Sequence, residues 1–215
     1  MKEVFAALRK RLSRSTPFVP SVVEPAMGAE SRWPPVYDFE QLTATIRRIV
    51  GTQELEKLLY DPSPSRPSFF QGDLIRLAVE LPFIGEDGQP KIQDGPPFWA
   101  VIGNTCDFDR AIEDVAFTQV VPVWNLGAAS RLPGETRVSF RRYRYYTQFY
   151  FPPWDAGSDD QVFVADFLRP VTIHKNALRN ASVVARLNRV GWILFHACVV
   201  RFLARDDGRE DQGAA

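Results

Sequence analysis

The residues best suited to chemistry in this chain are Asn104, Thr105, Cys106 and Asp107, which follow the apolar run at 98–102. A loop that directly follows a buried strand is held rigidly and often carries functional groups. A cysteine there acts as a nucleophile when a neighbouring base keeps it as the thiolate, and a carboxylate can orient that base or bind a metal. Thr105, Cys106 and Asp107 are therefore catalytic candidates, and Asn104 and Asp107 are binding candidates.

A structural interpretation of the same turn competes with the catalytic one. Cys106 would then be a small buried apolar residue, and Asp107 would cap a turn. The only histidines that could serve as a base are His174 and His196, and the sequence places neither beside Cys106. The histidines and cysteines have no zinc-ligand spacing, so we predict no metal and no cofactor. We assign no catalytic residue firmly and favour a protein that is not an enzyme.

Residues 141–150, with the sequence RRYRYYTQFY, form the second candidate region. The aromatic pattern predicts a strand or bent pair of strands over 138–151, with alternate side chains on opposite faces. Arg142, Tyr143, Arg144 and Tyr146 are the binding candidates. We rank three interpretations in this order: arginine stems packed over rings, a protein interface rich in Tyr and Arg, and a nucleic-acid surface on which bases stack. We also expect this region and residues 104–107 to form one binding surface.

The elements that must position these residues follow from the pattern of apolar runs and breakers. Strands that follow one another through short connections indicate an antiparallel sheet. We therefore predict an α+β protein, with a small antiparallel β-barrel or strongly bent sheet flanked by N-terminal and C-terminal helices. Trp99, Val101, Val121 and Val123 should be buried in it. The predicted strands are 73–79, 98–102, 116–123, 138–151 and 161–167, and the predicted helices are 2–14, 38–51, 53–60, 176–188 and 190–204.

Prolines and composition divide the chain into three predicted regions. Residues 1–67 hold N-terminal helices and a proline-rich arm. Residues 68–205 hold the β-core with its C-terminal helices, and the polar residues 206–215 form a disordered tail.

The charge balance and the cysteine content of the chain limit which partners and which cellular compartment we expect. The chain has 26 Lys plus Arg and 26 Asp plus Glu, and this balance argues against bulk electrostatic binding of nucleic acid but permits a local basic groove. The absence of net repulsion favours a protein partner or self-association, with single-stranded RNA as the other candidate partner. The two cysteines provide no disulfide framework, and no secretory signal or membrane-spanning run is visible, so we predict a cytoplasmic protein without membrane contact.

Three short motifs occur in the order typical of a known barrel. Gly72-Asp73 opens one strand, the next ends in Gly103-Asn104, and a third contains Val121-Pro122. This order resembles the PemK-type growth-inhibitor toxins over residues 71–124, and extends weakly to the helix near 190–203. The resemblance implies a ribonuclease toxin fold that dimerises and binds single-stranded RNA, as in toxin–antitoxin and phage-defence systems.

The chain departs from that family where the family's catalytic arginine would lie. Such toxins carry Arg-Pro before the second strand, whereas this chain has residues 95–98 as Gly-Pro-Pro-Phe. We therefore predict a noncatalytic binding or regulatory protein on a PemK-like barrel, in bacterial stress response or phage defence. The alternative is an endoribonuclease toxin acting on single-stranded RNA, with a rearranged site built from Thr105, Cys106, Asp107 and the arginines at 141–144.

Overall fold

The structure is a computed structural model that describes residues 39–51, 59–62, 68–84, 87–92, 95–155 and 157–204. The helix predicted at 2–14, the proline-rich arm, most of the helix predicted at 53–60 and the tail at 206–215 lie outside the described residues. No helix within the described ranges is long and apolar enough to cross a membrane.

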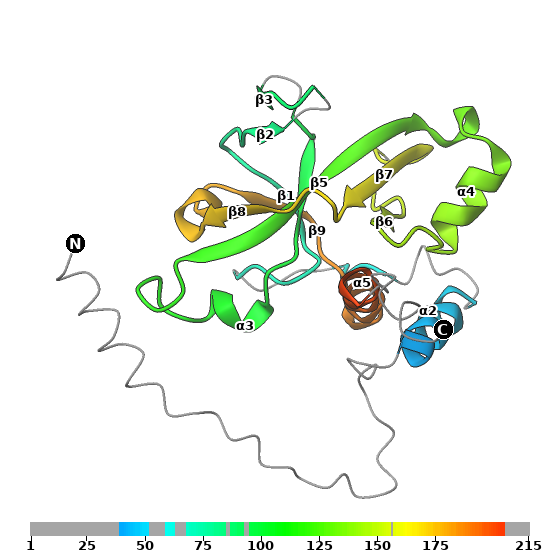
Figure 1. Ribbon diagram of the computed structural model, residues 1–215, viewed down its shortest axis with the longest axis horizontal. Coiled ribbons are helices and arrows are strands. Elements are labelled where there is room, and N and C mark those ends of the chain that lie inside the picture. The colour runs from blue at the N-terminus through cyan, green and yellow to red at the C-terminus, as the bar shows by residue number, and fades with distance from the viewer. Residues whose placement is uncertain are drawn as a thin grey trace, which may run out of the picture. The chain divides into compact units, whose positions relative to one another are not determined.

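The centre of the fold is an antiparallel sheet of seven strands (Figure 1). Its order is β6-β7-β5-β4-β1-β9, and β8 also pairs with β5. Since β6 and β9 end this order, the sheet is open. The predicted α+β class with an antiparallel sheet is confirmed, whereas the closed barrel does not form. The strands are β1 (Leu74–Arg76), β4 (Phe98–Val101), β5 (Phe117–Ala128), β6 (Gln148–Phe151), β7 (Gln161–Asp166), β8 (Val171–His174) and β9 (Ser182–Ala185), and β2 (Phe83–Ile84) pairs separately with β3 (Pro90–Lys91).

The long strand β5 organises this sheet. Its residues 120–123 pair with β4 on one edge. On the other edge, residues 117–120 pair with β8 and residues 123–128 pair with β7. Trp99 is 5% exposed, and Val101, Val121 and Val123 are fully buried, which confirms the burial predicted from their apolar runs.

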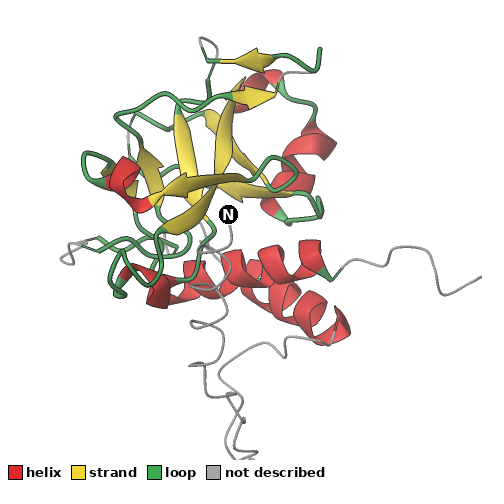
Figure 2. Ribbon diagram, turned by 60° about the vertical axis from the view of Figure 1, so that its left-hand side comes forward, coloured by secondary structure: helices red, strands yellow, loops and turns green. Residues whose placement is uncertain are grey.

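Two helices pack against each other below the strands in the view of Figure 2. In α2 (Phe39–Val50), Leu42, Ile46 and Ile49 recur at helical spacing and enter the main core. The helix α5 (Arg189–Leu203) begins at Asn188, whose side chain accepts hydrogen bonds from the amides of Val190 and Gly191. Both helices are confirmed predictions. A smaller core cluster is formed by Ile75, Trp99, Val101, Val120, Ile173 and Leu178.

The predicted strand over 138–151 is wrong. Residues Gly134–Arg141 form the helix α4, a turn follows, and only Gln148–Phe151 form a strand. The chain cannot stay extended through the turn because Tyr143 has φ of 50°, in the left-handed region. The Tyr143 hydroxyl donates to the carbonyl of Tyr150 at 3.0 Å, so its ring turns into the core. A tertiary contact thus overrides the strand propensity of the aromatic residues.

The helix predicted at 176–188 is also wrong. Lys175–Leu178 form one short 3-10 turn (η3), and Ser182–Ala185 form β9, which pairs with β1. The β-branched residues Val183 and Val184 suit a strand, and the edge of β1 satisfies their backbone groups. The remaining short elements are α3 (Thr105–Phe108) and η2 (Ala129–Arg131).

Candidate anion-binding site

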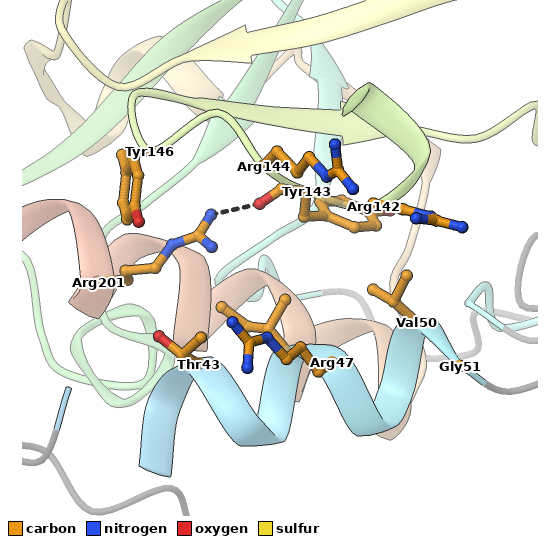
Figure 3. A pocket seen from close by; sticks show the side chains of 10 residues that line it. Thr43, Arg47, Val50, Gly51, Arg142, Tyr143, Arg144, Tyr146 and Arg201 are labelled. Carbon is orange, nitrogen blue, oxygen red and sulfur yellow. Dashed lines mark hydrogen bonds between the residues drawn. The ribbon is translucent and has the colours of Figure 1, made fainter. Parts of the chain in front are cut away.

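A cleft of about 630 Å³ lies between α2, the turn after α4 and the last part of α5 (Figure 3). We call it the arginine cleft, because four of its lining residues are arginines. Its lining residues are Thr43, Ile46, Arg47, Val50, Gly51, Arg142, Tyr143, Arg144, Tyr146 and Arg201. The site therefore joins three segments that are far apart in the sequence.

Arg201 forms the base of the arginine cleft. It is 4% exposed, and its side chain points between the turn and α2 (Figure 3). Its Nη2 donates to the carbonyl oxygen of Tyr143 at 2.7 Å and to that of Tyr145 at 3.3 Å. Its guanidinium also lies 4.7 Å from the centre of the Tyr146 ring. These partners offer only partial negative charge.

No carboxylate among the described residues pairs with Arg201, and its buried Nε has no hydrogen-bond partner there. A buried charge without a counter-charge is unfavourable, because the interior replaces little of the lost hydration. An anion that entered the cleft would supply both the missing charge and an acceptor for Nε. The hydroxyl of Thr43, which also lacks a partner in the described part of the chain, could donate to the same ligand.

The rim of the cleft adds three exposed arginines, Arg47, Arg142 and Arg144. None of the three has a salt bridge within the described ranges, and no Asp or Glu side chain is among the described lining residues. Guanidinium groups match phosphate oxygens in a two-point geometry. The arrangement suits an anion with several oxygens better than a single halide ion.

Tyr143 holds the turn that carries two of these arginines. It is 2% exposed, and its ring packs on Phe149 with centroids 5.0 Å apart. Its carbonyl oxygen accepts a hydrogen bond from Arg201. Of the four residues predicted from the 141–150 region, Arg142, Arg144 and Tyr146 thus present side chains near or at the surface of the cleft, whereas Tyr143 shapes it from beneath.

The turn at 104–107 lies elsewhere and is held by structural contacts. The Thr105 hydroxyl accepts from the amide of Gln71 at 3.1 Å, and Lys175 Nζ donates to the carbonyl of Asp107. Asn104 precedes α3 without a side-chain cap hydrogen bond. Cys106 is exposed, which contradicts the structural interpretation of a buried cysteine.

The surroundings of Cys106 do not form a catalytic pair. Its only hydrogen-bond partner among the described residues is Asp107 Oδ1 at 3.9 Å, so no histidine is bonded to it there. A reactive cysteine needs a neighbouring cation or base. The other cysteine, Cys198, is fully buried, and burial raises the pKa of its thiol to about 12.

Thr105 lines a second cavity of about 690 Å³ with Gln71 and Trp192 at the other end of α5. Gln71 Nε2 donates to the carbonyl of Ile102 at 2.9 Å, and Gln71 Oε1 lies 2.9 Å from His196 Nδ1. Since Oε1 can only accept, His196 donates from Nδ1, and burial lowers the pKa of this histidine. The second cavity and the arginine cleft share no lining residue. Thr105 and residues 142–146 therefore line separate recesses, and the single surface expected for residues 104–107 and 141–150 stays a prediction.

Sequence reasoning missed Arg47 and Arg201 as site residues. The available signal was Arg201, a lone charge inside the apolar stretch at 190–203. An arginine is rarely buried unless it is paired with an opposite charge or takes part in binding. Arg47 gave no comparable signal, because two neighbouring arginines at the end of an amphipathic helix are usually solvated.

The chain matches no protein-family model, no curated protein and no solved structure. The described residues contain no group of three or more His, Cys, Asp or Glu side chains that could hold a metal ion. The functional argument therefore depends on the geometry of the arginine cleft.

Proposed function

We propose that this chain is a noncatalytic binding protein whose arginine cleft takes up a phosphate-bearing ligand. The observation that carries the proposal is Arg201, buried without a carboxylate at the base of a cleft with three more arginines at its rim. A phosphate would compensate the buried charge and accept from several guanidinium groups at once. The regulatory role in bacterial stress response or phage defence belongs to this proposal and rests on the PemK-type likeness of residues 71–124.

The composition of the cleft favours binding over catalysis. Its described lining residues include no His, Cys, Asp, Glu or Lys, which are the side chains that most often transfer protons in active sites. The endoribonuclease alternative combines Thr105, Cys106 and Asp107 with Arg142 and Arg144. Thr105 lines the second cavity and the two arginines line the cleft, and this placement in two recesses favours the binding function over the alternative.

Calorimetric titration with pyrophosphate tests the proposal. Arg144→Ala and Arg47→Ala should each weaken binding about tenfold, because each removes a charge-assisted hydrogen bond worth about 1.5 kcal/mol or more. The matched control is Arg179→Ala, which removes another exposed arginine, one that follows η3 and does not line the cleft. Unchanged affinity in the cleft variants, or an equal loss in the control, would contradict the proposal.

A ribonuclease assay separates binding from catalysis. We expect no cleavage of a single-stranded RNA by the purified chain at neutral pH. Cleavage that disappears in both Thr105→Ala and Arg144→Ala would instead support the endoribonuclease alternative.

A further inference from the structure

The helix α5 brings the end of the described chain to the arginine cleft. Arg201, at the base of the cleft, is in the last turn of α5, which ends at Leu203. The described residues end at Ala204, which lies about 4.5 Å from Arg201 along the helix axis. Leu203 is 73% exposed, so the chain leaves the helix at the surface. The sequence that follows Ala204 therefore starts beside the cleft.

The residues after Ala204 carry the charge that the cleft lacks. Four of the six residues 206–211, which we call the acidic segment, are carboxylates: Asp206, Asp207, Glu210 and Asp211. The cleft is lined by four arginines and by no acidic side chain among the described residues. A fully extended chain spans about 7 Å from Ala204 to Asp206 and about 24 Å to Asp211, so each carboxylate can reach back over the cleft.

We propose that the acidic segment is an internal competitor for the arginine cleft: its carboxylates bind the guanidinium groups in the free protein, and a phosphate-bearing ligand displaces them. This inference rests on the proposed function, because it concerns the regulation of the same cleft. The segment would compensate the charge of Arg201, which is buried without a carboxylate among the described residues, while no ligand is bound.

Carboxylate and phosphate use the same chemistry in such a site. Both form two-point, charge-assisted hydrogen bonds with guanidinium groups. A phosphate group offers three oxygens and up to two negative charges, whereas a carboxylate offers two oxygens and one charge. The acidic segment can therefore occupy the cleft and still give way to a phosphate-bearing ligand.

Covalent attachment makes even a weak contact of this kind effective. A segment joined by a short linker has an effective concentration of about 1 mM at its site. If the separate peptide binds the cleft with a dissociation constant of about 0.1 mM, the attached segment occupies about nine-tenths of the molecules. The apparent affinity for pyrophosphate then falls about tenfold, because only the unoccupied cleft can bind it.

Neutralising the acidic segment in the full chain tests the competition. The variant carries four substitutions: Asp206→Asn, Asp207→Asn, Glu210→Gln and Asp211→Asn. Calorimetric titration should show that it binds pyrophosphate about tenfold more tightly than the unmodified chain at low salt. The ratio of the two affinities should decrease as the salt concentration increases, because salt screens the contact between the segment and the cleft.

The matched control neutralises four exposed acidic residues that do not line the cleft. Its substitutions are Asp109→Asn, Glu113→Gln, Asp114→Asn and Asp159→Asn. The net charge changes equally in both variants. The affinity of the control for pyrophosphate should change less than about twofold, because salt screens charges more than about 10 Å away.

A fluorescently labelled peptide of residues 205–215 shows whether the contact with the cleft is direct. Added to the neutralised variant, the peptide should bind with a dissociation constant of about 0.1 mM, and pyrophosphate should displace it. In the same background, Arg144→Ala should weaken binding of the peptide several-fold, whereas Arg179→Ala should leave it unchanged.

The outcomes separate this inference from the proposed function. If pyrophosphate binds the unmodified and neutralised chains equally, the competitor is wrong and the phosphate site stands. An equal gain in the control variant would assign the effect to net charge and would also overturn the competitor. If pyrophosphate binds neither chain, the proposed function fails. Peptide binding that Arg144→Ala weakens would then show that the acidic segment itself occupies the cleft, and the absence of peptide binding would overturn that occupancy too.

Discussion

Arg186 and Arg201 are both buried, at 6% and 4% exposure, but their surroundings differ. Arg186 donates to both carboxylate oxygens of Asp73, at 3.0 and 2.8 Å, and to the carbonyl of Ser68 at 2.7 Å. Its guanidinium also lies 4.5 Å from the centre of the Phe70 ring. Arg201 has carbonyl oxygens and a ring as partners, and no carboxylate among the described residues.

The difference separates a structural charge from a functional one. The pair of Arg186 and Asp73 joins residues 113 positions apart in the sequence, at the ends of β9 and β1. Each charge compensates the other, so neither of them needs a ligand as a counter-charge. Arg201 contributes to the positive potential of the cleft, because no carboxylate among the described residues neutralises its charge. Buried charges of this second kind are therefore the ones that point to a ligand.

The largest expected effect is the loss of the paired arginine. Arg186→Met would leave Asp73 buried without its partner and should lower the free energy of unfolding by about 3–5 kcal/mol. Arg201→Met removes a charge that has no carboxylate but leaves the Tyr143 and Tyr145 carbonyls without their donor, so it should lower this free energy by only about 1–3 kcal/mol while abolishing pyrophosphate binding. Urea denaturation of the two variants measures both values. Equal destabilisation would mean that Arg201 is a structural residue like Arg186.

Ligand binding should stabilise the protein only while Arg201 is present. Pyrophosphate at one hundred times its dissociation constant should raise the free energy of unfolding by about 2.7 kcal/mol, through preferential binding to the folded state. Thermal unfolding with increasing pyrophosphate measures this shift. For Arg201→Met we expect pyrophosphate to leave the unfolding temperature unchanged. An increase as large as that of the unmodified protein would mean that the anion binds elsewhere.

Truncation of an apolar side chain near Asp73 compares the stability lost through packing with the stability lost through an unpaired charge. Val101→Ala should lower the free energy of unfolding by about 1–3 kcal/mol, through lost burial and a small cavity. The expected loss is smaller than that of Arg186→Met. Val101 lies next to Asp73, since its backbone amide donates to the Asp73 carbonyl at 3.0 Å, and the substitution keeps this hydrogen bond. Val190→Ala is the control, because Val190 is 43% exposed and should lose little. A Val101→Ala loss as large as that of Arg186→Met would remove the distinction.

The smallest expected effect concerns His196, next to the second cavity. Burial lowers its pKa in the folded state, so the unfolded chain takes up a proton first as the pH falls. The stability that depends on neutral His196 is fully present above about pH 6.5, the ordinary pKa of histidine, and decreases as the pH falls below it. Denaturation midpoints between pH 5 and 8 should show this decrease, and it should be smaller in His196→Asn than in the control His174→Asn. The same decrease in both variants would assign the effect to another group.

Secondary structure was predictable from the sequence where the pattern of apolar residues within one segment determines it. Continuous apolar runs predicted the buried strands β4 and β5, and helical spacing predicted α2 and α5. The strand predicted at 138–151 failed because the turn depends on the hydrogen bond between Tyr143 and the Tyr150 carbonyl, which no local pattern reveals. The helix predicted at 176–188 failed because the pairing partner of β9 is β1, about a hundred residues away.

The candidate site was predictable only in part. Arginine and tyrosine side by side singled out Arg142, Arg144 and Tyr146, and the structure places all three around the cleft. The meeting of Arg47 with Arg201 depends on the packing of α2 against α5, which joins distant parts of the chain. Thr105 lines the second cavity instead, together with residues at the start of α5.

The left-handed conformation of Tyr143 has a consequence for the entropy of binding. A residue other than glycine at φ of 50° is costly, and it persists here because its hydroxyl and ring are fixed by Tyr150 and Phe149. The loop bearing Arg142 and Arg144 therefore already has a fixed backbone shape before any ligand arrives. A partner that binds there loses little free energy to ordering this loop, so more of its contact energy is available as affinity.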